Sequence, residues 1–138
     1  MALGLEPSPE DAPLRLKNLR NGLLHLHSVL LHSERGLYEH EVQRIRTQGH
    51  FLELLLHDPA FEWLRELSQF VVLIDERLEE DDPPSREEAG RLVARAREML
   101  TPSQTGSAFE TRYLAALQRD PDVVIAHSAI LNLLKTLE

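Results

Sequence analysis

The chain has 138 residues, the length of one ordinary domain, and 42% of them are hydrophobic, which is enough to bury a core and argues against general disorder. Its formal net charge of −8 disfavours nucleic acid as a partner, because phosphate binding needs clustered cations. The absence of cysteine excludes disulfides, thiolate nucleophiles and cysteine-based zinc sites.

The first residues, "MALGLEPSPEDAP", have neither the basic start nor the apolar stretch of a signal peptide. No run reaches the length of about 18 apolar residues that a membrane-spanning helix needs. We therefore expect a cytoplasmic protein that does not enter a membrane. Residues 1–12 combine prolines and acidic residues without periodicity, so they are predicted to form a flexible N-terminal tail before a single domain at 13–138.

The first predicted helix runs from Leu14 to about Ile45, because leucines recur there at helical spacing. The stretch "LLHLHSVLLH" within it places histidines on both sides of this helix. His25 and His32 fall on the polar side with His40, whereas His27 falls near the middle of the leucine face. We therefore expect His27 to point into the core.

A turn at "TQG" precedes a short helix, "HFLELLLH", over residues 50–57. His50, Glu53 and His57 share one face of this helix at i, i+3 and i+7. Imidazole and carboxylate groups at such spacing can bind a metal ion, although the same positions suit a solvated polar face. The Glu-x-x-His pairs of known di-metal bundles are absent from the sequence, and no cofactor is expected.

A third helix is predicted from Asp58-Pro59 to about Glu80, since Asp is a good N-cap and Pro fits the first helical position. Its apolar residues repeat at 3-4-3-4 spacing, the strongest helical signal in the chain. Asp75 borders this apolar face. We predict that Asp75 contacts an inward-pointing histidine or the hydroxyl of Tyr38 or Tyr113, because buried polar groups need hydrogen-bond partners.

Three further helix starts are marked by their caps. Ser85 with Glu88, and Ser107 with a glutamate three residues later, form capping boxes, and Asp120-Pro121 opens the last helix. His127 falls within the apolar face of that last helix. Two β-branched runs, "FVVLI" and "VVI", lie inside helical periods and predict no strand. The sequence thus predicts an all-α fold, an antiparallel helical bundle of five or six helices around a single core.

Three functions remain open, and no catalytic constellation accompanies them. The first is a non-catalytic protein–protein interaction module, with a protein partner or self-association, suggested by apolar residues that fall off the buried faces: Leu54, Val72, Leu73 and Ile125. The second is a binding protein for a small apolar ligand in the bundle interior, with polar anchors from His27, His127, Asp75, Tyr38, Tyr113 and Trp63. The third is a metal-binding bundle protein that uses His50, Glu53 and His57.

The stretch "HFLELLLHDPAFEWLRELSQFVVLIDERL", with "RYLAALQRDPDVVIAHS" further on, resembles uncharacterised helical proteins encoded in many bacterial genomes. The resemblance covers most of the chain after residue 20. It implies a bacterial protein with a single helical domain. It implies no activity and transfers no catalytic residue.

Overall fold

The structure is a computed structural model that describes residues 11–103 and 105–138. All regular secondary structure within these ranges is helical. The elements are α1 (Asp11–Glu41), α2 (Gln48–His57), α3 (Pro59–Glu62), α4 (Arg65–Glu79), α5 (Arg86–Met99), α6 (Ala108–Arg119) and α7 (Pro121–Leu137). The predicted all-α helical bundle is confirmed, with seven helices in the described ranges.

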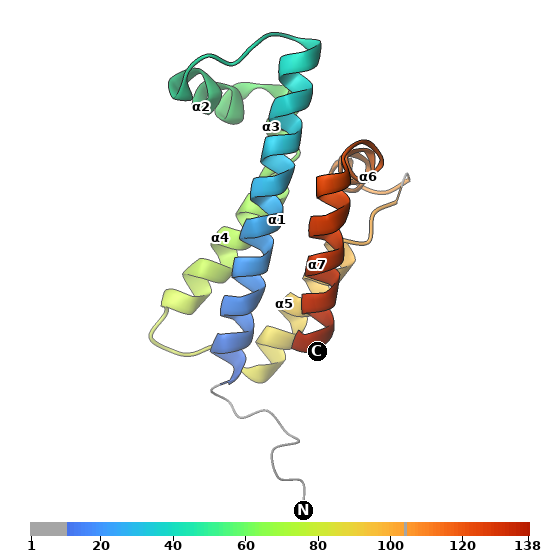
Figure 1. The fold of residues 1–138 in the computed structure, drawn as a ribbon. Coiled ribbons are helices and arrows are strands. Elements are labelled where there is room, and N and C mark those ends of the chain that lie inside the picture. The colour runs from blue at the N-terminus through green and yellow to red at the C-terminus, as the bar shows by residue number, and fades with distance from the viewer. Residues whose placement is uncertain (1–10, 104) are drawn as a thin grey trace, which may run out of the picture.

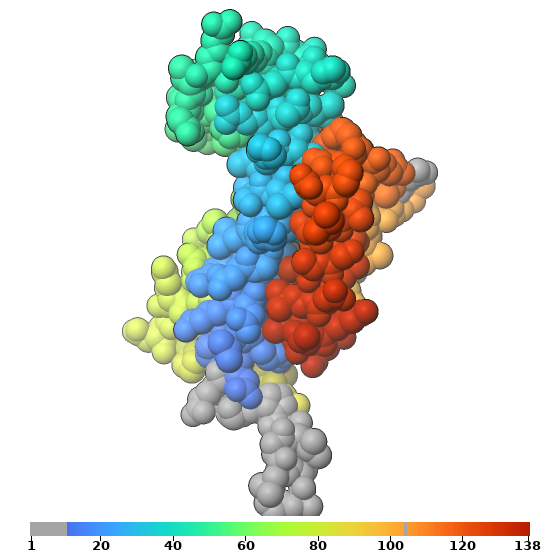
Figure 2. Space-filling view, in the orientation of Figure 1, coloured from blue at the N-terminus to red at the C-terminus, as the bar shows by residue number. Residues whose placement is uncertain are grey.

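The long helix α1 is the centre of the bundle. It packs against α4, α5 and α7, and Figure 1 shows α4 and α7 on either side of it with α5 behind. The four longest helices alternate in direction along the chain (Figure 1), so α4 and α7 run antiparallel to α1, whereas α5 runs in the same direction as α1. The short helices α2 and α3 lie at the far end of α1, where α2 stands out from the bundle (Figure 2).

The helix starts are set by the local caps that the sequence predicts. The Asp58 carboxylate accepts a hydrogen bond from the Ala60 amide at 2.9 Å, and Asp120 caps α7 in the same way. At α5, both halves of the capping box are present, with the Glu88 amide 3.1 Å from the Ser85 hydroxyl. These side chains satisfy amide groups that would otherwise lack partners in the first helical turn.

The predicted helix over residues 59–80 is interrupted at Trp63 and Leu64, which separates α3 from α4 and raises the number of helices above the expected five or six. The Leu64 amide donates to the Phe61 carbonyl at 3.2 Å, a tighter i to i−3 bond than an α-helix makes. Trp63 and Leu64 are both buried, at 7% and 3% exposure. Packing of both side chains into the core therefore determines that the helix is interrupted here. The local sequence does not determine it.

The two ends of α1 also differ from the prediction. Of the predicted tail at 1–12, residues 1–10 lie outside the described residues, whereas Asp11 and Ala12 already belong to α1 and Ala12 is buried. At the other end, α1 stops at Glu41. Ile45 remains buried in the following turn, where its amide donates to a Glu39 carboxylate oxygen at 3.1 Å.

The buried apolar side chains form one core, with α1 supplying a row of fully buried leucines. Gly22 belongs to this packing, although its position on the helical wheel predicts the polar side. A Cβ atom on Gly22 would lie 2.5 Å from Leu133 Cδ2 and 2.7 Å from Ile130 Cδ1, so glycine permits the close approach of α7. The helical wheel gives the wrong side for Gly22 because other helices pack on α1 from several directions. No helix in the described part of the chain is long and apolar enough to cross a membrane.

Candidate interaction surfaces

Tyr113 and His127 form a polar pair between α6 and α7. The Tyr113 hydroxyl lies 2.6 Å from Nδ1 of His127, and the two rings meet edge to face with centroids 5.4 Å apart. Burial raises the pKa of Tyr113 and lowers the pKa of His127, so both side chains are held neutral. A neutral hydroxyl can then donate to a neutral imidazole, which makes the pair a structural hydrogen bond.

This pair belongs to a continuous row of rings, in which the half-buried His127 follows three buried aromatic side chains. Trp63 packs on Phe109 with centroids 5.5 Å apart, and Phe109 packs on Tyr113 at 5.7 Å. The structure therefore brings Trp63, Tyr113 and His127 together, as a solid aromatic layer joined by Phe109. Rings at these separations are in direct contact, which leaves no space for a ligand between consecutive members.

The other proposed ligand anchors lie elsewhere. Tyr38 packs on Phe61 with ring centroids 5.6 Å apart, near the end of α1. His27 is half-buried on α1, and burial lowers its pKa. Within the described residues, no hydrogen bond joins His27 to His127. The predicted set of six anchors is thus dispersed over several parts of the fold.

The predicted contact of Asp75 is wrong. Its carboxylate forms an ion pair with Arg20 of α1, with Oδ1 2.8 Å from Nη1, and it contacts neither an inward histidine nor a tyrosine hydroxyl. Asp75 is still about half exposed. It lies at the edge of the α1–α4 interface, where a long arginine side chain can reach it more readily than a buried ring can.

The three candidate metal ligands do not gather around one point. Among residues 11–103 and 105–138, no group of three or more His, Asp or Glu side chains could hold a metal ion. His50 and His57 are seven residues apart on α2, a rise of about 10 Å along the helix axis. With Glu53 between them, their side chains do not converge on a common point among the described residues.

An ion pair between the buried Glu34 and the exposed Arg119, which sequence reasoning did not find, joins α1 to the end of α6. Glu34 is only 5% exposed, and its Oε1 accepts a hydrogen bond from Arg119 Nη2 at 2.8 Å. The same nitrogen donates to the Ser33 hydroxyl at 3.1 Å. The pairing is between residues distant in sequence, so no local pattern reveals it.

The predicted apolar interaction set is divided among separate surfaces. Leu54 is partly buried against the core. Val72 and Leu73 are exposed on α4, and Ile125 is exposed on α7. Because α4 and α7 lie on opposite sides of α1 (Figure 1), Ile125 does not belong to the same patch as the α4 residues.

Leu73 instead lines a groove between α4 and α5, two helices that both pack on α1. The groove has a volume of about 450 Å³. Its apolar lining comes from Leu73, which is 42% exposed, and from the half-buried Leu92. Charged residues from both helices surround them: Glu76, Arg77, Glu80, Glu88, Arg91 and Arg95.

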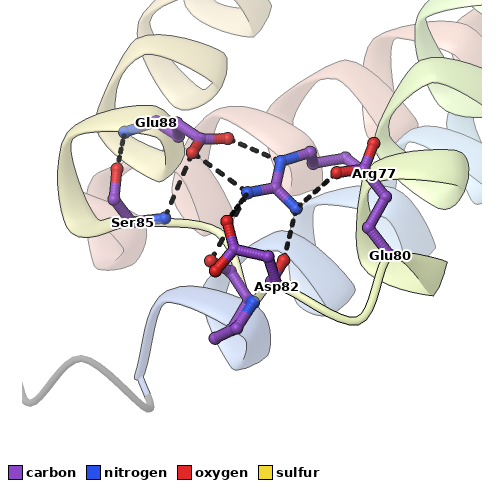
Figure 3. Close-up of polar contacts among 6 residues, drawn as sticks. Arg77, Glu80, Asp82, Ser85 and Glu88 are labelled. Atoms are coloured by element: carbon purple, nitrogen blue, oxygen red, sulfur yellow. Dashed lines mark hydrogen bonds and ion pairs between the residues drawn. The ribbon is translucent and has the colours of Figure 1, made fainter.

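A network of polar contacts around Arg77 forms part of the groove wall (Figure 3). Arg77 binds Glu88 through two nitrogens, with Nε–Oε2 and Nη2–Oε1 distances of 2.7 and 3.1 Å. Its Nη1 also donates to the Asp82 carbonyl at 2.7 Å. The hydrogen bond from Arg77 lowers the pKa of Glu88, and it raises the pKa of Arg77. Arg77 therefore holds the α4–α5 connection in place and has few donors left for a ligand.

The remaining arginines of the groove are better placed to meet a partner. Arg91 is exposed on α5, and one helical turn further along, the Arg95 guanidinium lies 4.8 Å from the centre of the Phe70 ring. Stacking on the ring limits the motion of Arg95. On the facing wall, Glu76 lies on α4, whereas Glu80 follows the last residue of that helix and forms an ion pair with Arg77, with Oε2 3.1 Å from Nη1. Glu76 therefore faces Arg91 and Arg95 with the opposite charge.

A second exposed apolar surface lies on α2, which contains no buried residue. Leu52 and Leu56 are 57% and 54% exposed, whereas Phe51 packs edge-on against Phe61 of α3 with centroids 5.8 Å apart. Sequence reasoning missed these two leucines. The signal was present, because apolar residues surround most of this short helix and only one side of it can face the bundle.

Comparisons with protein-family models, with curated proteins and with solved structures found no match. The resemblance to helical proteins of bacterial genomes therefore stays a prediction from the sequence. Two apolar surfaces, the α4–α5 groove and the exposed side of α2, are the candidate sites for a partner.

Proposed function

We propose that the protein is a non-catalytic protein–protein interaction module whose α4–α5 groove binds an amphipathic helix of a partner protein. The observation that carries the proposal is Leu73, a large apolar side chain left 42% exposed beside Leu92 in a groove with charged walls. Burying one leucine-sized anchor from a partner in such a place contributes about 1.5 to 3 kcal/mol. Helix-in-groove recognition uses anchors of this kind.

The charges of the walls specify the chemistry of the partner. Arg77 engages both Glu88 and Glu80, so the acidic wall of the groove rests on Glu76 of α4. The basic wall consists of Arg91 and Arg95 on α5. A fitting helix has an apolar stripe with basic residues on one flank and acidic residues on the other. Complementary charges of this kind select the partner and exclude helices that bring like charges together.

Three synthetic helical peptides with the same apolar stripe test the proposal. One has a basic and an acidic flank, one has two acidic flanks, and one has two basic flanks. Fluorescence anisotropy should show that the mixed peptide binds about tenfold more tightly than the other two, because each of those meets one repulsive wall. Amide resonances of Leu73, Leu92 and Arg95 should shift during an NMR titration with the mixed peptide.

Matched variants locate the binding surface. Leu73→Glu should weaken binding of the mixed peptide by tenfold or more, whereas Leu24→Glu should leave it unchanged, although Leu24 of α1 is 48% exposed. Circular dichroism confirms that both variants are folded. Equal binding of all three peptides, absence of binding near 1 mM, or equal effects of the two substitutions would each contradict the proposal.

A further inference from the structure

The helix α2 is poorly covered by the rest of the molecule. Its 10 residues pack mainly against α3, and its side chains are at most partly buried. A helix this short is marginal in water without tertiary contacts. Leaving Leu52 and Leu56 in solvent therefore forgoes stabilisation that a second protein surface could supply.

The exposed side of α2 has the spacing of a helix–helix seam. Gly49, Leu52 and Leu56 follow one another at intervals of three and four residues, as in a coiled coil. No atom of the described residues lies within 4 Å of the position that a Cβ atom on Gly49 would take, so this end of the seam is open to close approach. Glu53 and His57 run beside the seam on one flank, the acid nearer the helix start and the imidazole nearer its end.

We propose that two copies of this chain associate through α2, with the two α2 helices antiparallel about a twofold axis. In that arrangement each flank of the seam faces the same flank of the other copy in the reverse direction. Glu53 then lies opposite His57 of the second copy, and this pairing occurs twice. A parallel arrangement would instead bring this flank opposite the other flank of the second copy, so that Glu53 and His57 would not face each other. The order of the two residues thus makes the surface self-complementary only in the antiparallel sense.

The surface is small, so the dimer is weak. It consists of a few side chains on each copy, which bury less than the roughly 1,200 Å² of a standard interface. We expect a dissociation constant on the order of 100 µM. In Figure 2, α2 forms one end of the molecule and stands apart from the bundle, which leaves room for a second copy.

Sedimentation equilibrium of the full chain over concentrations up to about 1 mM tests the association. The wild-type protein should form dimers, and Leu52→Glu should raise the dissociation constant by tenfold or more. Leu24→Glu, on a similarly exposed leucine of α1, and Leu73→Glu, in the α4–α5 groove, should leave it unchanged. A protein that stays monomeric throughout, or a Leu52→Glu variant that dimerises normally, overturns the proposal.

A charge exchange tests the direction of the two helices. Glu53→Lys should weaken the dimer by about two- to fivefold, as expected for solvent-exposed pairs. The double variant Glu53→Lys with His57→Glu places opposite charges across the antiparallel seam and should recover the wild-type affinity. Failure of this recovery, in variants with normal circular dichroism spectra, overturns the antiparallel arrangement. Because the groove variant is a separate control, the dimer and the partner-binding proposals fail independently.

Discussion

Replacing Tyr113 with phenylalanine tests whether the pair with His127 stabilises the fold. The ring of Tyr113 is fully buried, and its hydroxyl makes a 2.6 Å hydrogen bond to Nδ1 of His127. Tyr113→Phe keeps the ring and its packing on Phe109 but removes this bond. Loss of one such hydrogen bond costs about 0.5 to 1.5 kcal/mol. With an unfolding entropy of about 2.1 cal/mol/K per residue, a loss of 1 kcal/mol corresponds to about 3 to 4 °C in Tm.

The assay is urea unfolding at pH 7, in which the loss of helix is monitored by far-ultraviolet circular dichroism. A double-mutant cycle with His127→Phe, which retains an aromatic ring, isolates the bond itself, and its coupling energy should be about 1 kcal/mol. Tyr38→Phe is the matched control, because Tyr38 is also buried but no hydrogen bond of its hydroxyl is found within the described residues. Its free energy of unfolding should change little.

Two results would refute this reasoning. If Tyr113→Phe and Tyr38→Phe lower the free energy of unfolding equally, the hydroxyl of Tyr113 has no special role. If the cycle gives no coupling between Tyr113 and His127, the short contact does not stabilise the folded state.

Other predictions concern pH and two glycines. Burial lowers the pKa of His127 in the folded chain, so the imidazole is protonated in the unfolded chain at a higher pH than in the folded chain. The stability that is present above about pH 6.5 is therefore lost as the pH falls from that value toward the pKa of the folded chain. His127→Phe should reduce this loss in urea unfolding between pH 7 and 5, whereas substitution of the exposed His25 by glutamine should not; equal effects would contradict burial as the cause. Gly36→Ala should raise the free energy of unfolding by about 0.5 to 1 kcal/mol, because the site is helical and its Cβ position is open. Gly22→Val should lower it by about 1 to 3 kcal/mol, since a Cβ there would meet Leu133 at 2.5 Å; a stabilised Gly22→Val would show that α7 moves away at no cost.

The sequence could predict those parts of the fold that depend on neighbouring residues. Ser85 with Glu88, Asp58-Pro59 and Asp120-Pro121 each mark a helix start with groups only a few residues apart, and the structure contains all three caps. The same locality explains why the all-α class follows from the sequence, because helical periodicity is read within a few turns.

The features that the sequence could not predict depend on distant partners. Gly22 belongs to the α1–α7 contact, and Glu34 pairs with Arg119, which lies 85 positions later. Asp75 was correctly placed at the border of an apolar face, but its partner, Arg20, comes from another helix. In each case the helical wheel gives the direction of a side chain and says nothing about which element lies there.

The central position of α1 also determines how the molecule opens. At 1.5 Å per residue its 31 residues span about 46 Å, and it carries α4 and α7 on opposite sides. Detaching either neighbour would expose leucines of α1 to water, so amides in the middle of α1 should exchange with deuterium only when the whole bundle unfolds. Amides of α2, which has no buried side chain, should exchange through local unfolding of that helix, which needs little free energy. The protein would then combine one cooperative unit with an internal segment, α2, that samples unfolded conformations independently. Dimer formation through α2 would slow exchange in that segment alone.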